Sequence, residues 1–366
     1  ITRRDWSSDV CSSDLFTMKC TIQNIADHLG LSRNTVSKAL KNSSEVSENT
    51  RNLVIKTASK LGYKKATFAT PVIPASETGS NGTILFLTRT YASDSEFWTT
   101  VLRGIESILS NANYHLAISI MSDSDLKQLN FPQTISDSSI KGIILVEICD
   151  KVVCDALSQF NLPIVSVDMP NVPFEELNGI DVVTMESKKN LKKIINQLIE
   201  KGAESFGFVG DLYSPNVSRG FQERYNALSE CLAEHQLPLN QKNCLLHQTP
   251  EDFRNFQTTV NNLQAMISLP DVFICGNDWT AIQLIYALQF LGFQIPKDIC
   301  VVGFDNIPAA SRISPSLTTI STPQKYLGIA AARQILERIQ HPNCPHVFCQ
   351  YETELIIRNS TNITSF

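Results

Sequence analysis

The sequence predicts an α/β protein in which a small all-α helix-turn-helix unit precedes two Rossmann-like lobes. Three observations predict this class. Short segments with apolar residues at helical spacing fill residues 21–62. From residue 82 onward, buried-strand runs alternate with amphipathic helices in units of about 30 residues, which is typical of parallel sheets. Residues 66–81 are rich in Pro, Ser, Thr and Gly and separate the two parts as a linker would.

The distribution of charge separates the same two parts. The chain has 366 residues, 43% of them hydrophobic and 18% charged, as in ordinary globular proteins. Its formal net charge is −5, yet residues 18–65 carry nine basic and three acidic side chains and therefore a charge of +6, which leaves −11 for the rest. This asymmetry favours a small polyanion-binding module on a larger acidic body, although a solvated Lys-rich surface would look similar.

The first 17 residues stand apart from both parts. They lack the apolar stretch of a signal peptide and are rich in Ser and Asp. We expect residues 1–17 to be adaptor-derived sequence ahead of a start at Met18, and we leave them out of the fold. No apolar stretch approaches the roughly 18 residues that a membrane helix needs, so we expect a cytoplasmic protein with no membrane partner.

The ten cysteines are spread through apolar runs, and none form a Cys-x-x-Cys pair. Reduced thiols that pack as small hydrophobes are the simpler interpretation. His341, Cys344, His346 and Cys349 have donor types that bind zinc, but their spacing fits no usual zinc site and prolines interrupt it. We therefore expect neither a metal nor a cofactor.

Three short helices are predicted between residues 21 and 62. Thr21 is a good N-cap for a first helix that ends at Gly30, and the apolar stripe of this helix consists of Ile22, Ile25, Ala26 and Leu29. Ser32 caps a second helix, which packs through Val36, Ala39 and Leu40. A third helix starts after Ser47 and stops at Gly62, because a left-handed residue costs little there only for glycine.

The turn between the first two helices, Gly-Leu-Ser, has the length found in a helix-turn-helix. In that geometry the second helix enters a major groove about 12 Å wide, where Arg and Lys pair with guanine and Asn pairs with adenine. The outward side chains are all basic or hydrogen-bonding: Arg33, Asn34, Ser37, Lys38 and Lys41. A three-helix bundle with a polar face and no nucleic-acid role is the alternative.

The run from Thr21 to Lys41, continued by Val46-Ser-Glu-Asn-Thr-Arg and Leu61-Gly-Tyr, resembles the headpiece of LacI/GalR-family transcriptional regulators. The resemblance implies a DNA-binding domain over residues 18–65. In that family the positions of Arg33, Asn34 and Lys38 contact bases, and those of Ser32, Thr35 and Ser37 more often contact phosphates. The expected DNA-binding residues are Thr21, Ser32, Arg33, Asn34, Thr35, Ser37, Lys38 and Lys41.

The linker at residues 66–81 departs from the family pattern. Family members follow the Gly-Tyr with a hinge helix whose leucine wedges into the minor groove. Here Pro71 and Pro74 would stop any helix, and Val72 takes the leucine position. Kinking of the minor groove by an apolar wedge is therefore in doubt, whereas reading of the major groove is not.

Residues 82–366 are expected to form two lobes of parallel sheet covered by helices. In the first lobe, strands are predicted at 83–88, 114–120, 142–146 and 163–168, with a helix at 101–109. In the second lobe, strands are predicted at 205–210, 271–275 and 299–305, with helices at 191–201, 222–235 and 279–291.

Polar side chains follow several of these strands. Ligands of such sheets bind beyond the carboxyl ends of the strands, which makes Asp168, Asn277, Asp278 and Asp305 candidates for ligand contact. The alternative is that they cap helices or form turns, as Asp and Asn constantly do.

From Leu61 to Ser360 the chain also looks like the LacI-family effector domain, which is itself similar to periplasmic sugar-binding proteins of type I. Arg224 matches the arginine of a family helix, with Ala227 in place of the usual glycine, and Cys275-Gly-Asn-Asp matches the family's Asn-Asp turn. Phe97 and Trp98 fall where paired aromatics line the pocket. The resemblance implies an effector site formed by Phe97, Trp98, Asp168, Arg224, Asn277, Asp278 and Asp305.

These residue types suit a polyhydroxylated ligand. Carboxylates and Asn bind neighbouring hydroxyls, a guanidinium contacts two oxygens at once, and an aromatic face stacks on C–H groups. Arg224 could equally bind a carboxylate or a phosphate. Sugars and sugar phosphates are the expected effectors, and nucleobases remain open.

The sequence favours a repressor that binds double-stranded operator DNA and responds to a small effector. A secreted solute receptor would need a signal peptide and no headpiece. An enzyme is disfavoured, because G-x-G-x-x-G after the first strand, a P-loop and a G-x-S-x-G elbow are all absent. A twofold homodimer is expected, and the helix around residues 328–339 offers an apolar face that could pair the subunits.

Overall fold

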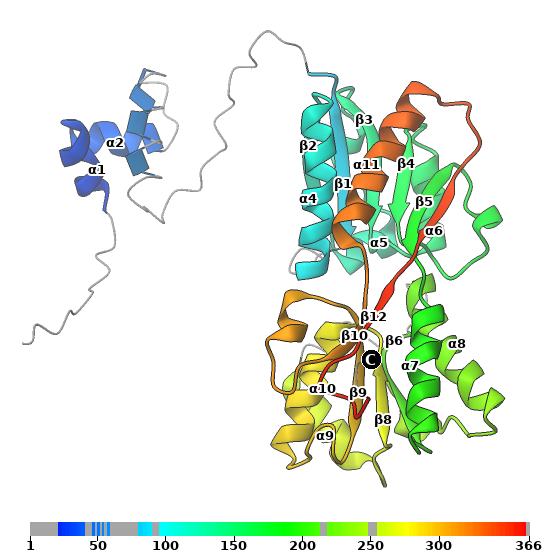
Figure 1. Ribbon diagram of the computed structural model, residues 1–366. Coiled ribbons are helices and arrows are strands. Elements are labelled where there is room, and N and C mark those ends of the chain that lie inside the picture. The colour runs from blue at the N-terminus through cyan, green and yellow to red at the C-terminus, as the bar shows by residue number, and fades with distance from the viewer. Residues whose placement is uncertain are drawn as a thin grey trace, which may run out of the picture. The chain divides into compact units, whose positions relative to one another are not determined.

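The computed structural model describes residues 21–40, 46–47, 50–51, 53–54, 57–58, 80–89, 95–212, 218–247 and 255–363. The chain divides into two compact units, residues 1–79 and residues 80–366 (Figure 1). Residues 1–17 and most of the predicted linker lie outside the described residues.

The first unit contains the two helices of the predicted helix-turn-helix, α1 (Ile22–Leu29) and α2 (Arg33–Leu40). The predicted start and end of α1 are confirmed: the Thr21 hydroxyl accepts from the Asn24 backbone, and Gly30 is left-handed with φ of 63°. The Ser32 hydroxyl accepts from the backbone N–H of Thr35 at 3.0 Å at the start of α2. The two helices pack on a small core that contains Ile25, Ala26, Val36, Ala39, Val46, Val54 and Ala58.

The third predicted helix is described in part. Residues 50–51, 53–54 and 57–58 are helical, and the Ser47 hydroxyl accepts from the backbone N–H of Thr50 at 3.3 Å. A helix that begins after Ser47 is therefore confirmed, and its predicted end at Gly62 lies outside the described residues.

The first lobe of the second unit is built on a parallel sheet in the order β11-β5-β4-β3-β1-β2. Its helices include α4 (Glu96–Asn111), α5 (Asp123–Gln128), α6 (Lys151–Ser158) and α11 (Gln324–Gln340). The strands are β1 (Thr83–Arg89), β2 (His115–Met121), β3 (Ile140–Val146), β4 (Ile164–Val167), β5 (Ile180–Met185) and β11 (Phe348–Tyr351). The inner strands are buried on both faces, which explains their nearly continuous apolar runs.

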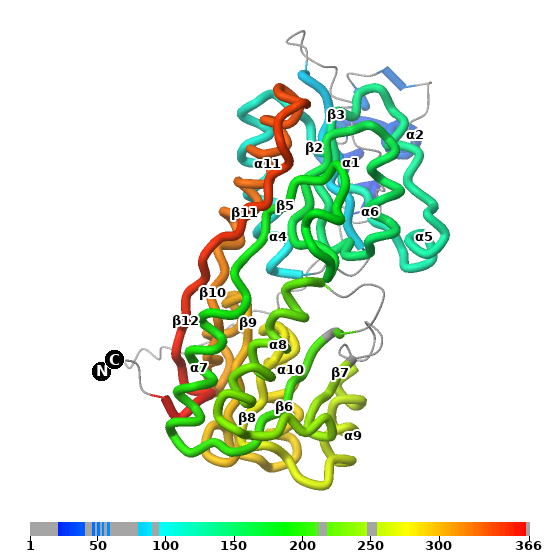
Figure 2. The backbone as a smooth tube through the Cα atoms, turned by 90° about the vertical axis from the view of Figure 1, so that its right-hand side faces the viewer, coloured from blue at the N-terminus to red at the C-terminus, as the bar shows by residue number. Residues whose placement is uncertain are grey.

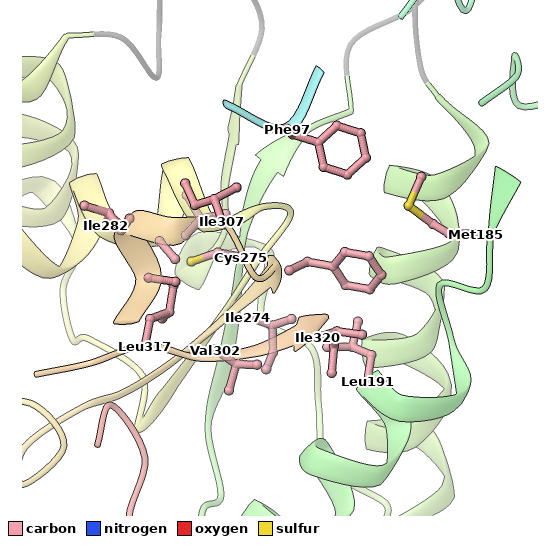
Figure 3. Packing of buried hydrophobic residues seen from close by; sticks show 14 of the residues in the cluster. Phe97, Met185, Leu191, Ile274, Cys275, Ile282, Val302, Ile307, Leu317 and Ile320 are labelled. Atoms are coloured by element: carbon pink, nitrogen blue, oxygen red, sulfur yellow. The ribbon is translucent and has the colours of Figure 1, made fainter. Parts of the chain in front are cut away.

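The second lobe repeats this plan with the order β12-β10-β9-β8-β6-β7, in which β12 is antiparallel to β10. Its strands are β6 (Phe206–Asp211), β7 (Leu245–His247), β8 (Val272–Cys275), β9 (Cys300–Asp305), β10 (Thr318–Ser321) and β12 (Glu354–Ile356). Its helices include α7 (Lys189–Glu200), α8 (Arg219–Glu234), α9 (Phe256–Ala265) and α10 (Asp278–Phe290). Figure 3 shows part of the core, in which Ile320 lies beside Leu191 and Ile274 and Val302 stand on the neighbouring strands.

The chain crosses between the lobes three times, from β5 to α7, from β10 to α11 and from β11 to β12 (Figure 2). The crossings are tied together, because the Asn190 amide donates to the Thr353 carbonyl at 2.7 Å and Lys189 pairs with Glu352 at 3.1 Å. Backbone atoms also meet between the lobes where the N–H of Arg219 donates to the Met169 carbonyl at 2.9 Å.

The sequence-based expectation for the helix around residues 328–339 is wrong. The apolar side of α11 packs inside the first lobe against α4, and Leu327, Ala331 and Ile335 are buried there. Gly104 and Gly328 let the two helix backbones approach, since a Cβ on Gly328 would overlap the Val101 carbonyl oxygen. This face is therefore not available to a second subunit.

Candidate nucleic-acid interface and effector pocket

The second helix of the headpiece, α2, presents the predicted DNA-binding side chains. Arg33 and Asn34 are exposed in its first turn, whereas Ser37 and Lys38 are half-buried one turn later. The Ser32 and Thr35 hydroxyls lie 2.8 Å apart and close the start of the helix. Lys41 lies outside the described residues.

The hydroxyl side chains at the starts of α1 and α2 cap these helices, whereas the Arg33 and Asn34 side chains are exposed. Thr21, Ser32 and Thr35 are engaged in capping, as Thr21 Oγ1 also donates to the Asn24 side chain at 2.6 Å. Arg33 and Asn34 stand at the N-terminal end of α2, which is the part of a recognition helix that contacts base edges in helix-turn-helix proteins.

In the second unit, Arg224 is the centre of a buried polar cluster. Its side chain is 3% exposed, and its Nη1 donates to the Gly276 carbonyl at 2.7 Å. The guanidinium lies 3.6 Å from the centroid of the Phe304 ring, in a stacking geometry. Asp305 follows Phe304 at the end of β9. The end of β9 therefore lies next to Arg224, which belongs to α8.

Lobe 1 contributes Asp168 to the same cluster. An ideal Cβ on Gly220 would lie 3.4 Å from Arg224 Nη2, 3.5 Å from Ser187 Oγ and 3.7 Å from Asp168 Oδ2. The three side chains therefore converge on one point, although Asp168 follows β4, Ser187 follows β5 and Arg224 stands on α8. Of the predicted effector residues, Asp168 and Arg224 are thus brought together between the lobes, and Asp305 is close enough to act electrostatically on Arg224.

Burial dominates the electrostatics of this cluster. It raises the pKa of Asp168, against the opposing effects of the Met169 N–H and Arg224. It also raises the pKa of Asp305 well above its usual range, where Arg224 opposes and the carboxylates of Asp278, Asp168 and Glu147 add to the rise. For Arg224 itself, burial lowers the pKa of the guanidinium while the surrounding carboxylates, led by Asp305, raise it.

Several buried polar atoms of this region lack a hydrogen-bond partner among the described residues. They are Thr88 Oγ1 at the end of β1, Ser187 Oγ after β5, and Arg224 Nε. Buried polar groups in folded proteins are nearly always paired, so these atoms are candidates for contact with a ligand or a water. Thr88 and Ser187 were missed by sequence reasoning, although a hydroxyl next to the end of a strand is the same signal that selected Asp168.

The side chains of Asn277 and Asp278 accept hydrogen bonds from backbone N–H groups of the second lobe. The Asn277 side chain caps α10 by accepting from the Thr280 N–H at 2.9 Å. Asp278 is fully buried and accepts from the Ile307 N–H at 2.9 Å and from the Thr319 hydroxyl at 2.5 Å. Burial raises the pKa of Asp278 to about 7. Both side chains have the capping or turn-forming role that was the alternative for them, and effector contact stays a prediction.

The predicted aromatic pair stands at the start of α4. The rings of Phe97 and Trp98 meet edge to face, with centroids 4.5 Å apart. Phe97 is buried and belongs to the core in Figure 3, whereas Trp98 is half-buried. Trp98 is therefore the member of the pair with surface left for a ligand.

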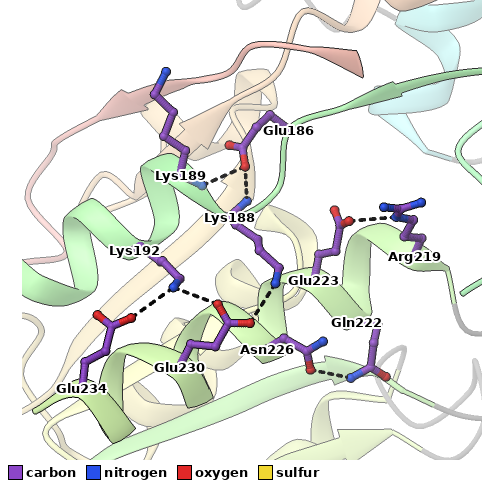
Figure 4. A network of polar contacts seen from close by, with 10 residues as sticks. All are labelled: Glu186, Lys188, Lys189, Lys192, Arg219, Gln222, Glu223, Asn226, Glu230 and Glu234. Atoms are coloured by element: carbon purple, nitrogen blue, oxygen red, sulfur yellow. Dashed lines mark hydrogen bonds and ion pairs between the residues drawn. The ribbon is translucent and has the colours of Figure 1, made fainter. Parts of the chain in front are cut away.

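A groove of 610 Å³ lies elsewhere between the lobes. It is lined by Asn171, Val172, Pro173, Phe174, Glu175, Lys188, Arg219, Glu223, Asn226 and Phe348. Its cations are already paired, Arg219 with Glu223 and Lys188 with Glu230, each at 2.8 Å (Figure 4). None of the predicted effector residues lines it. The buried cluster around Arg224, with its unpaired polar atoms, is therefore the better candidate for an effector site.

The His/Cys segment considered for zinc has other contacts. His346 Nδ1 lies 3.2 Å from Asp181, and Arg338 donates to the Cys344 carbonyl. Within the ranges that the structure describes, no group of three or more His, Cys, Asp or Glu side chains is placed to hold a metal ion. The same part of the chain includes no helix long and apolar enough to cross a membrane.

A helix-turn-helix unit joined to two lobes with a polar cluster between them defines the class of ligand-responsive DNA-binding regulators. Residues 21–65 match the model of the bacterial regulatory proteins of the lacI family, and residues 195–361 match the periplasmic binding protein-like domain. Over these two ranges the chain therefore carries a DNA-binding domain of the lacI family and a periplasmic binding protein-like domain.

Curated relatives agree with this assignment along nearly the whole chain. The HTH-type transcriptional repressor PurR of Photobacterium profundum is 26% identical over 93% of this chain and 98% of its own length. The ribose operon repressor of Haemophilus influenzae is 27% identical over the same shares. Both relatives are transcriptional repressors by name.

Solved structures share the fold. The complex of the regulator CelR with cellobiose has a TM-score of 0.66 at 19% identity and covers 93% of this chain and all of its own. The lac repressor dimer bound to operator has a TM-score of 0.64 at 20% identity, covering 94% and 99%. A LacI-family regulator of Enterococcus faecium with bound ribose has a TM-score of 0.62 at 24% identity, covering 76% and 98%.

Proposed function

We propose that this protein is a transcriptional repressor whose affinity for operator DNA is controlled by a small, sugar-like effector. The observation that carries the proposal is the meeting of Asp168, Ser187 and Arg224 near one point between the lobes, with Asp305 close enough to act electrostatically on Arg224. The chain also carries a lacI-family headpiece, so a ligand site in the lobes would allow an effector to control DNA binding.

The DNA-binding domain is proposed to span residues 18–65, followed by a linker at 66–81. Arg33, Asn34 and Lys38 would contact bases, since Arg and Lys suit guanine and Asn suits adenine. Ser32, Thr35 and Ser37 would contact phosphates near the start of α2, with Thr21 and Lys41 at the two ends of the interface. The positive charge of this region supports phosphate binding.

Residues 82–366 are proposed to bind the effector and to form the dimer. The solved relatives with ribose and with cellobiose support a sugar-like ligand. Because the lobes are joined by three crossings, a ligand that contacts both lobes would stabilise one angle between them. An effector that binds one arrangement of the lobes more tightly than another shifts the population toward the first arrangement. If the two arrangements differ in their affinity for DNA, effector binding then changes operator binding.

A second copy of the chain is proposed to pack on α10. Trp279, Tyr286 and Phe290 lie along this helix at 40%, 43% and 68% exposure, and Phe256 of α9 contacts Phe290 edge to face. Exposed apolar patches of this kind mark interfaces. The lac repressor structure with the same fold is a dimer.

A regulator of this design binds its ligand without transforming it and would work in the cytoplasm, where its operator lies.

The proposal is tested by binding the full chain to a pool of genomic DNA fragments, with and without a panel of sugars and sugar phosphates. We expect enrichment of a palindromic sequence, as two symmetry-related headpieces require, and a several-fold change in that enrichment with one ligand. If no sequence rises above salt-sensitive background binding, the repressor function is overturned. If a sequence is enriched but no ligand shifts it, the effector part fails alone.

A further inference from the structure

We propose that Gln324 is a positioning residue of the effector site, because its side chain reaches from a helix of the first lobe and holds the main chain of Asp305 in the second lobe. The inference rests on the proposed function, since it takes Asp305 as an effector-binding residue. It is carried by the backbone conformation of Asp305 and by the hydrogen bonds that its carbonyl group accepts.

The end of β9 has an unusual backbone conformation. Asp305 and Asn306 both lie in the left-handed region, with φ of 117° and 56°. Such a conformation is costly for a residue other than glycine, and it persists only where surrounding contacts hold it. Strained residues of this kind are common at ligand sites, where they keep a side chain in place before the ligand binds. The contacts that hold Asp305 therefore determine where its carboxylate points.

The Asp305 carbonyl accepts two hydrogen bonds from the segment that leads out of the second lobe. Gln324 Nε2 donates to this oxygen at 2.7 Å, and the Thr322 hydroxyl donates to it at 3.3 Å. Ser321, the last residue of β10, lies opposite Asp305 in the paired strands, so the chain passes beside Asp305 as it leaves the sheet. Gln324 makes the shorter bond, and at 9% exposure its side chain is shielded from water that would compete for the carbonyl.

Gln324 begins a helix of the first lobe, whereas the residue after Asp305 is held from within the second lobe. The Asn306 N–H donates to the Thr319 hydroxyl at 3.3 Å, and Arg358 donates to the Asn306 side-chain oxygen at 2.7 Å. Gln324 is the first residue of α11, which packs against α4 in the first lobe. The bond from Gln324 to Asp305 therefore ties a strained residue of one lobe to a helix of the other.

The direction of Asp305 matters because of the groups beside it. Phe304 covers one face of the Arg224 guanidinium at 3.6 Å, and Asp305 has the largest effect among the carboxylates that raise the pKa of Arg224. If Asp305 relaxed to a negative φ, its Cβ would turn about the N–Cα bond and carry the carboxylate away from its present direction. Gln324 opposes that turn. Loss of Gln324 should therefore weaken effector binding through Asp305.

The first test needs no ligand. Gln324→Leu removes the donor, Gln324→Lys keeps a donor of similar reach, and Gln159→Leu is the matched control, since the Gln159 amide donates to the Asp155 carbonyl within the first lobe. Hydrogen exchange of the full chain, measured by mass spectrometry, follows the peptide that contains Asn306 and Ile307, whose N–H groups are both hydrogen-bonded. We expect about 10-fold faster exchange there in Gln324→Leu, and nearly wild-type exchange in the other two variants. Unchanged exchange in folded Gln324→Leu overturns the inference.

A double-mutant cycle separates positioning from a general structural role. We would titrate wild type, Gln324→Leu, Asp305→Ala and the double variant by calorimetry with ribose and with cellobiose, after melting curves have shown that each variant folds. For a sugar that binds wild type, Gln324→Leu should weaken binding about 10-fold or more, and Gln324→Lys should restore most of the affinity. In the Asp305→Ala background, the same Gln324→Leu change should cost less than about 2-fold, because the carboxylate that it positions is gone.

The outcomes distinguish this inference from the proposed function. If the losses of Gln324→Leu and Asp305→Ala multiply, or if Gln324→Leu binds as tightly as wild type, the inference is overturned and the proposed function stays intact. Where Asp305→Ala binds too weakly to measure, recovery of affinity by Gln324→Lys decides instead. If no sugar of the panel binds the wild-type chain, the effector role of Asp305 fails, and the inference falls with the proposed function.

Discussion

Arg338 and Asp181 form a two-point ion pair buried in the first lobe. Arg338 Nε donates to Asp181 Oδ2 at 3.0 Å, and Nη2 donates to Oδ1 at 2.8 Å, with the two side chains 5% and 0% exposed. The Val347 N–H and the Gln334 amide also donate to Asp181. The pair therefore joins α11 to β5, and the Val347 bond adds the segment that enters β11, the strand that leads on to the third crossing between the lobes.

Removing one partner of this pair should destabilise the first lobe. We expect Asp181→Ala to lower the free energy of unfolding by about 3–5 kcal/mol, because Arg338 would be left buried without its counter-charge. Asp155→Ala, which breaks the exposed Lys151 pair, should cost less than about 1 kcal/mol. Denaturant unfolding measures both, and equal losses would contradict the role given to burial.

Asp181 also predicts a dependence on acid. Burial raises its pKa, but the bonds from Arg338, Gln334 and Val347 outweigh burial, and the net pKa lies below the ordinary 3.8. The stability contributed by this carboxylate is therefore present above that value and is lost as the pH falls through the lowered pKa. Wild-type protein and Asp181→Ala should approach each other in stability in this acidic range, which thermal melts at a series of pH values would show.

Asp278 predicts a pH dependence of opposite sign. Its pKa in the folded chain is about 7, raised by burial from the ordinary 3.8, so the folded state holds a proton that the unfolded state has lost. Stability should therefore fall as the pH rises from about 4 toward 7. The stability of Asp278→Asn relative to wild type should improve by about 2–3 kcal/mol between pH 5 and 8. A difference that stays constant over this range would rule out the raised pKa.

The contact between α4 and α11 predicts the effect of a single methyl group. Gly328→Ala should lower the free energy of unfolding by about 1–3 kcal/mol, because the added Cβ would overlap the Val101 carbonyl and push the helices apart. Arg333→Ala, on the exposed face of the same helix, is the matched control and should be nearly neutral. A neutral Gly328→Ala would mean that the two helices can separate without cost.

For DNA binding, the base contact assigned to Arg33 predicts a large loss on truncation. Arg33→Ala should weaken binding to the selected operator roughly 10- to 100-fold and relax the preference at one base pair. Arg312→Ala, an exposed arginine of the second lobe, should leave operator affinity unchanged. Fluorescence anisotropy with operator and scrambled duplexes makes the comparison. An equal loss on both duplexes would place Arg33 on phosphate instead.

If α10 forms the dimer interface, a charged side chain introduced on its exposed apolar surface should weaken the dimer. Phe290→Glu should shift the protein toward monomer, because it places a carboxylate in the apolar patch with Phe256 and Tyr286. Val152→Glu changes another exposed apolar residue, on α6, and should leave the oligomeric state as it was. Sedimentation velocity distinguishes the two forms, and an unchanged dimer in the Phe290 variant would move the interface elsewhere.

The local features of this protein could be predicted from its sequence because their causes lie within a few residues. Thr21, Gly30 and Ser32 determine where the headpiece helices begin and end, and the apolar runs of β1, β3 and β9 predict buried strands. The strand β5 was not predicted. Asp181 interrupts its apolar run, and that carboxylate is satisfied in the sheet by groups more than 150 residues later, Arg338, Gln334 and the Val347 N–H.

The tertiary structure alone decided which of the candidate residues meet. Asp168, Asn277, Asp278 and Asp305 carry the same signal in the sequence, a polar side chain at the end of a strand. Only the fold places Asp168 near Arg224 as well as on the Met169 N–H, and it engages Asn277 and Asp278 with backbone N–H groups of the second lobe. It also covers the apolar side of α11 with α4, whereas α10 buries most of its apolar residues and leaves Trp279, Tyr286 and Phe290 exposed. The reason is physical: caps and periodicity act within one turn or strand, whereas contacts between elements depend on how the sheets order strands that are distant in the chain.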